Sequence, residues 1–129
     1  MNKILIEVSV GELLDKISIL EIKQDKIKDS SKLKYIKDEY NVLKEQVSKN
    51  LKSDDKLNEL FQSLKEINSK LWVIEDDKRM CEKKSDFGEK FIKLSRDVHF
   101  LNDDRAKIKL EINNHTGSVI KEIKEYTSY

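Results

Sequence analysis

Residues 87–112 read FGEKFIKLSRDVHFLNDDRAKIKLEI, and the spacing of their apolar side chains indicates one long helix. These side chains recur at alternating steps of three and four residues, as on one face of an α-helix. Such alternation is typical of helices packed side by side in bundles and coiled coils. One charged residue, Arg105, interrupts the face. The residues of this helix face are Phe87, Phe91, Leu94, Val98, Leu101, Arg105, Ile108 and Ile112.

Three earlier segments show the same alternation, and short polar residues precede each of them. Ser9 with Glu12 predicts a capping box at the start of the first helix, and Asp86 with Glu89 predicts another for the fourth. Gly117 predicts a left-handed stop after the fourth helix. One of residues 53–55 is expected to cap the third helix. The predicted helices therefore cover about residues 10–29, 32–50, 56–83 and 87–116.

The two ends of the sequence are less regular. Residues 3–8, KILIEV, are rich in β-branched side chains and too short for a helix, so they predict a short strand or an extended arm. Residues 119–126, VIKEIKEY, fit either further helical turns or a strand, and the spacing slightly favours the helix.

The whole chain is thus predicted to be one all-α domain, residues 1–129. The sequence has no proline and only three glycines, so few residues interrupt long helices. We expect an antiparallel four-helix arrangement with two long C-terminal helices and a short extended N-terminal arm.

Composition narrows the classes of function. The 26 Lys and Arg residues nearly balance the 25 Asp and Glu residues, which gives a net charge of +1. Nucleic acid and anionic membrane surfaces are therefore not expected partners. No apolar run approaches the ~18 residues of a membrane span. The single Cys81 cannot form an intrachain disulfide, and we expect the protein in the cytoplasm.

No catalytic residue, metal ligand set or cofactor motif is predicted. Metal-binding helical bundles use Glu-x-x-His pairs, and neither His99 nor His115 has a glutamate three residues before it. The acidic run at residues 75–77 reads as a solvated helix face. Phosphate-binding loops and dinucleotide fingerprints are also missing from the sequence.

Arg105 marks a predicted polar layer inside the bundle. Residues at equal distances from the turns lie at similar levels in antiparallel helices, which places Arg105 near Glu21 and several amides. A planar guanidinium suits a partly buried carboxylate. We favour a layer that fixes helix register, and a small anionic ligand at this layer is the alternative. The predicted members are Glu21, Gln24, Tyr40, Asn68, Asn102 and Arg105.

The turn between the third and fourth helices is expected to project beyond the shorter first pair. The long helices have about 30 residues each and the short ones about 20. Two helices alone cannot cover the apolar side chains of residues 73–97, and such a patch usually marks an interface. We therefore expect a homodimer, with charged residues 75, 76, 79 and 96 at its rim. The candidate interface residues are Trp72, Ile74, Arg79, Phe87, Phe91 and Leu94.

Several strings of the chain resemble a small bacterial and phage protein family of unknown function. They are VSVGELLDKISILEIK, LWVIEDDKR, FGEKFIKLSRDV, LNDDRAKIKLEIN and GSVIKEIKEY, which together cover nearly the whole chain. The resemblance implies a compact helical protein, sometimes encoded near surface-polysaccharide genes. It implies no established activity and transfers no catalytic residue.

These observations favour a non-enzymatic module for protein–protein interaction or assembly. Its expected partners are a second copy of the chain and an unidentified protein. The alternative is an enzyme or sensor that binds a small anionic ligand at the Arg105 layer.

Overall fold

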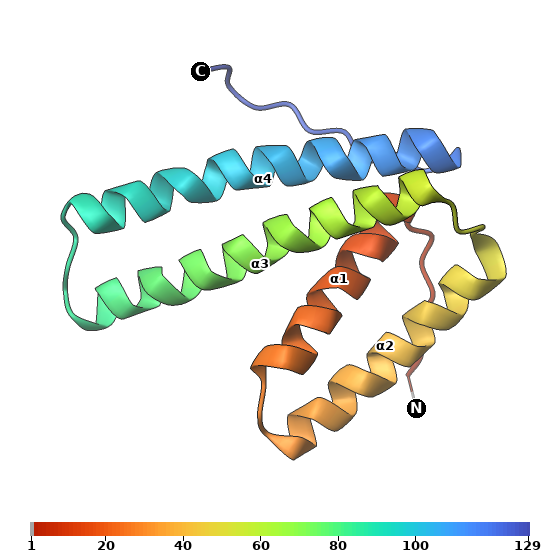
Figure 1. Cartoon of the computed structure of the whole chain (residues 1–129), viewed down its shortest axis with the longest axis horizontal. Coiled ribbons are helices and arrows are strands. Elements are labelled where there is room, and N and C mark those ends of the chain that lie inside the picture. The colour runs from red at the N-terminus through yellow and green to blue at the C-terminus, as the bar shows by residue number, and fades with distance from the viewer. Residues whose placement is uncertain (1) are drawn as a thin grey trace.

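The computed structural model describes residues 2–129, and it consists of four helices joined by short connections (Figure 1). The described residues include no strand. The predicted all-α class and the two long C-terminal helices are therefore confirmed. The helices are α1 (Val10–Lys26), α2 (Ser30–Asn50), α3 (Asp55–Lys83) and α4 (Glu89–Thr116).

Most helix ends follow the predicted capping chemistry. The Ser9 Oγ accepts a hydrogen bond from the Glu12 N–H at 3.1 Å, and Asp54 caps α3 through the Leu57 N–H. Gly117 ends α4 in the left-handed conformation, with φ 67°. Helix α1, however, ends at Lys26 rather than near residues 29–31. Asp29 instead caps α2, because its carboxylate accepts from the N–H groups of that helix's first turn.

Two further predictions are wrong, one about the start of α4 and one about the C-terminal tail. Helix α4 begins at Glu89, and its N-cap is Gly88, which has no side chain to offer the helix. Asp86 accepts from the Gly88 N–H at 3.2 Å, so it shapes the turn rather than capping the helix. The tail after Gly117 forms no helical turn and folds back along α4 (Figure 1). A left-handed residue reverses the chain direction, which separates the tail from the helix.

The four helices form two hairpins of unequal length that meet at one end. Helices α3 and α4 lie antiparallel along their whole length, and α1 packs across both of them (Figure 1). Among the described helices, α2 lies beside α1 alone. The apolar core therefore sits where α1 crosses the longer hairpin. Its buried members are Leu14, Ile17, Leu57, Leu60, Leu64 and Ile112.

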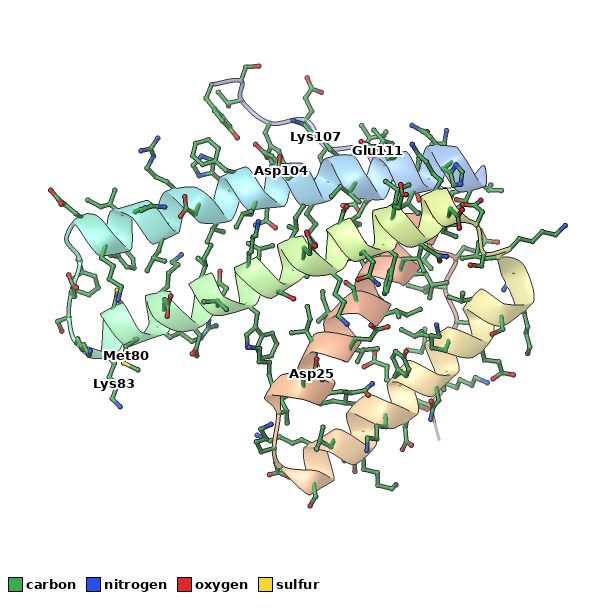
Figure 2. The ribbon with its side chains drawn as sticks, in the orientation of Figure 1. Asp25, Met80, Lys83, Asp104, Lys107 and Glu111 are labelled. Atoms are coloured by element: carbon green, nitrogen blue, oxygen red, sulfur yellow. The ribbon has the colours of Figure 1, made fainter. Side chains whose placement is uncertain are left out.

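The opposite end of the α3–α4 hairpin extends past this core, as predicted from the helix lengths. Figure 2 shows Met80 and Lys83 at that free end, away from α1 and α2. The outer side of α4 is polar nearer the core, where Asp104, Lys107 and Glu111 point away from α3 (Figure 2).

Residues 2–8 form an extended arm, which is one of the two structures predicted for this segment. Ile4, Leu5 and Ile6 are exposed by 84%, 82% and 76%. The arm therefore contributes little to the core of its own chain.

Candidate functional site: a polar seam between α1 and α4

A buried ion pair joins α1 to α4. The Arg105 guanidinium binds both carboxylate oxygens of Asp15, with Nε donating to Oδ1 at 2.9 Å and Nη2 donating to Oδ2. Asp15 is only 2% exposed. A bidentate guanidinium–carboxylate pair fixes the relative position of the two helices as well as contributing energy.

Helix α3 completes the environment of this carboxylate. Asn68 donates from Nδ2 to the Asp15 Oδ1 at 2.8 Å and to the Ser18 Oγ at 2.7 Å. Burial alone raises the pKa of Asp15, but the hydrogen bonds from Arg105 and Asn68 outweigh it and the pKa is lowered. Asp15 is therefore held as a carboxylate at neutral pH.

One turn further along α4, Lys109 makes a second connection to α1. Its ammonium donates to Glu12 at 2.7 Å and to Glu122 of the tail at 3.0 Å. Burial lowers the pKa of Lys109, but these two carboxylates outweigh burial and the net shift is upward. In the predicted capping box, the Glu12 carboxylate would accept from the Ser9 N–H. It binds Lys109 instead, so only the Ser9 half of the box is formed.

A third connection brings the two backbones together. The Gly11 N–H donates to the Asn113 Oδ1 at 2.7 Å, and the Val10 N–H donates to the Ser118 Oγ at 3.1 Å. A Cβ on Gly11 would lie 2.6 Å from the Lys109 backbone oxygen, so only glycine fits this approach. The first N–H groups of α1, which have no partner within their own helix, are satisfied by α4 and the residue after its cap.

These three connections form one continuous polar seam. Arg105, Lys109 and Asn113 are four residues apart, so they share one face of α4. They meet α1 in antiparallel order. The members of the polar seam are Gly11, Glu12, Asp15, Arg105, Lys109 and Asn113.

The structure divides the polar layer predicted from the sequence. Arg105, Asn68 and Asn102 lie together, and the Arg105 Nη1 donates to the Asn102 Oδ1 at 3.4 Å. Glu21 and Tyr40 form a separate group, in which Glu21 accepts from the Tyr40 hydroxyl at 3.2 Å.

Lys65 supplies the other partner of Glu21, at 2.9 Å, so this carboxylate does not contact Arg105. The Gln24 Nε2 joins neither group and is buried without a hydrogen-bond partner. Levels counted from the turns apply only to helices that are parallel to one axis. That count fails because α1 crosses the longer hairpin and α2 lies beside α1 alone.

Asp15 is the residue that the sequence interpretation missed. A pattern could have identified it, because Gly11, Asp15, Ser18 and Ile22 are spaced by four, three and four residues and are all buried. This second stripe of α1 contains small and polar side chains. Apolar periodicity alone does not identify such a stripe.

The charged groups of the polar seam already have partners of opposite sign. A small anion at Arg105 would have to displace the buried Asp15 carboxylate. Arg105 also lines neither the groove between α3 and α4 nor the groove beneath the tail. Among residues 2–129, no group of three or more His, Cys, Asp or Glu side chains could hold a metal ion.

The residues predicted for an interface lie on the α3–α4 hairpin, with differing exposure. Phe87 is 52% exposed and packs edge-to-face on the partly buried Phe91, with ring centroids 5.5 Å apart. Arg79 is exposed and bridges to Glu75 at 3.1 Å. Trp72, Ile74 and Leu94 are partly buried.

Beside these residues runs an open groove between α3 and α4, with a volume of about 610 Å³. Its surface is almost entirely apolar. The lining residues are Ser69, Lys70, Val73, Ile74, Asp97, Phe100 and Leu101.

Comparison with known proteins identifies the family of this chain, but that family has no known activity. No curated protein and no solved structure matches the chain. No helix of the described residues is both long enough and apolar enough to cross a membrane. A family profile matches residues 4–129, and the chain therefore belongs to the family of unknown function DUF6165.

Proposed function

We propose that this protein is a protein–protein interaction module that self-associates through the free end of the α3–α4 hairpin. The observation that carries this proposal is the exposure of large apolar side chains where α1 and α2 no longer cover the hairpin. Val73 and Ile92 are exposed by 48% and 54%, on α3 and α4 respectively. Phe87 at the turn is exposed to a similar degree. A patch of exposed apolar side chains with charged residues near it often marks an interaction site.

The border of this patch carries charges of both signs. Glu75 with Arg79 and Asp97 with Lys93 form ion pairs within their own helices. In a two-fold dimer the same patch is used on both copies, so each charge also faces the opposite charge when the hairpins approach antiparallel. The apolar groove between α3 and α4 would supply the buried centre of the contact.

A small anionic ligand at Arg105 has less support. The planar fork of the guanidinium, which would recognise a carboxylate or phosphate, is already engaged by Asp15.

Sedimentation velocity at micromolar concentration tests the proposal. The wild-type chain should sediment as a dimer or a larger species, well above its mass of 15.2 kDa. Val73→Glu and Ile92→Glu should each shift the protein toward smaller species than wild type, because a charge in the buried centre of an interface is costly. Val42→Glu is the matched control, since Val42 is 58% exposed and lies on α2, away from the hairpin end.

Two results would contradict the proposal. One is a wild-type protein that remains monomeric across the concentration series. The other is a dimer that persists in both hairpin variants and dissociates only with Val42→Glu, which would place the contact on α2.

A further inference from the structure

The arm, residues 2–8 with sequence NKILIEV, is an extended segment whose residues are all exposed. Within the described chain, its backbone takes part in no hydrogen bond. Its three central side chains, Ile4, Leu5 and Ile6, are among the most exposed apolar groups of the structure. An extended backbone with free N–H and C=O groups is a template for pairing with another strand.

The order of residues in the arm is complementary to itself in the antiparallel direction. When two copies pair about a two-fold axis at Leu5, Lys3 lies opposite Glu7 and Ile4 lies opposite Ile6. Both charges then face opposite charges, and the central apolar side chains, residues 4–6, face apolar ones. A shift of the register by one residue in either direction would put Lys3 opposite an apolar side chain, either Ile6 or Val8. A parallel in-register pairing would put like charges together.

We propose that the arms of two copies of this chain pair as an antiparallel two-stranded ribbon centred on Leu5. Successive side chains alternate between the faces of the ribbon. Ile4 and Ile6 of both copies therefore cover one another on one face, where Val8 lies opposite Asn2. On the other face, Lys3 and Glu7 form ion pairs on either side of Leu5.

The structure also gives the arm a fixed point of departure. Ser9 is buried, and the next two N–H groups are bound by Ser118 and Asn113. The arm thus leaves a rigid part of the fold, which reduces the entropy lost when it pairs. This point lies at the core end of the molecule, away from the free end of α3–α4 (Figure 1). The arm contact is therefore a second surface, independent of the hairpin contact proposed above.

Cysteine crosslinking tests the register directly. Leu5 faces its own copy across the two-fold axis, so Leu5→Cys should form a disulfide-linked dimer under mild oxidation. Ile4→Cys should crosslink much less, because residue 4 faces residue 6. An equimolar mixture of Ile4→Cys and Ile6→Cys chains should recover the crosslink. The wild-type chain is the control for Cys81, which is buried.

Charge reversal in the Leu5→Cys background tests the pairing of Lys3 with Glu7. Lys3→Glu or Glu7→Lys alone places like charges opposite each other twice, and should lower the crosslink yield by roughly threefold to tenfold. Mixing the two variants should restore the yield, because each then meets opposite charges on its partner. The double variant should restore it as well.

Equal yields from Leu5→Cys and Ile4→Cys would overturn the proposal, since they would indicate random collision. Charge variants that leave the yield unchanged, or a mixture that fails to recover it, would overturn the register. Repeating the Leu5→Cys experiment with Ile92→Glu separates the two contacts. The arm crosslink should persist there even when the hairpin contact is lost.

Discussion

At the core end of the molecule, ion pairs join helices that are distant in the sequence, whereas at the free end of the α3–α4 hairpin they join neighbours on one helix. Arg105 reaches Asp15 across ninety positions of the chain. Arg79 reaches Glu75, four positions away, and its side chain is 74% exposed. The same guanidinium–carboxylate pair therefore fixes the relative position of two helices at the core end. At the free end it lies on a solvated surface and joins residues of one helix. Burial and sequence separation distinguish the two roles.

The largest expected effect is at the core end. Arg105→Ala leaves the Asp15 carboxylate buried without its main partner and should lower the free energy of unfolding by ~3 kcal/mol. Arg79→Ala is the matched control and should cost less than ~0.5 kcal/mol, since exposed pairs contribute little. Urea unfolding of both variants measures the difference. Equal losses would show that the two pairs are not distinct in the way described.

A smaller loss is expected where the two backbones approach. Gly11→Ala should lower the free energy of unfolding by about 1–3 kcal/mol, because the added Cβ meets the Lys109 backbone oxygen. Helix propensity alone predicts the opposite sign, a gain of up to ~1 kcal/mol. The sign of the change in urea unfolding therefore decides between local propensity and tertiary contact. A variant more stable than wild type would refute the close approach.

Acid sensitivity gives a further difference between the regions. The pKa of Asp15 is lower in the folded than in the unfolded chain, so its contribution to stability is complete above the ordinary aspartate pKa of ~3.9. That contribution is lost as the pH falls through the lowered value. Asp15→Asn should therefore show a shallower fall in melting temperature below pH ~4.

The variant need not become independent of pH, because Asp54 also has a lowered pKa. Glu75→Gln is the control at the free end and should keep the wild-type slope. A slope unchanged by Asp15→Asn would contradict the role given to this carboxylate.

The smallest expected effect is a gain at the free end. Gly88 is the N-cap of α4 but offers no side-chain acceptor, and its backbone lies in the extended region that cap residues adopt. Gly88→Ser should stabilise the protein by a few tenths of a kcal/mol, about the difference between serine and glycine caps. Thermal unfolding would show a small rise in melting temperature. A clear loss would mean that the turn at residues 84–88 does not tolerate a side chain.

The sequence by itself determined the number of helices, their approximate lengths and most of their ends. Apolar periodicity and capping are local properties, set within a few residues of each position. For example, the spacing of three leucines predicts one face of a helix, and all three lie in the core: Leu57, Leu60 and Leu64. For the same reason the sequence predicts Ser9 and Gly117 as helix ends, and it narrows the cap of the third helix to residues 53–55, of which Asp54 is the one.

Only the tertiary structure decided that Asp15, rather than Glu21, binds Arg105. Which side chains meet depends on the angle at which α1 crosses the longer hairpin, and that angle follows from packing between ridges of side chains on different helices. Capping and spacing carry no information about it. The same holds for Gly11. Glycine is ordinary at a helix start, but here the absence of a side chain lets the backbone of α4 at Lys109 come into contact with the backbone of α1.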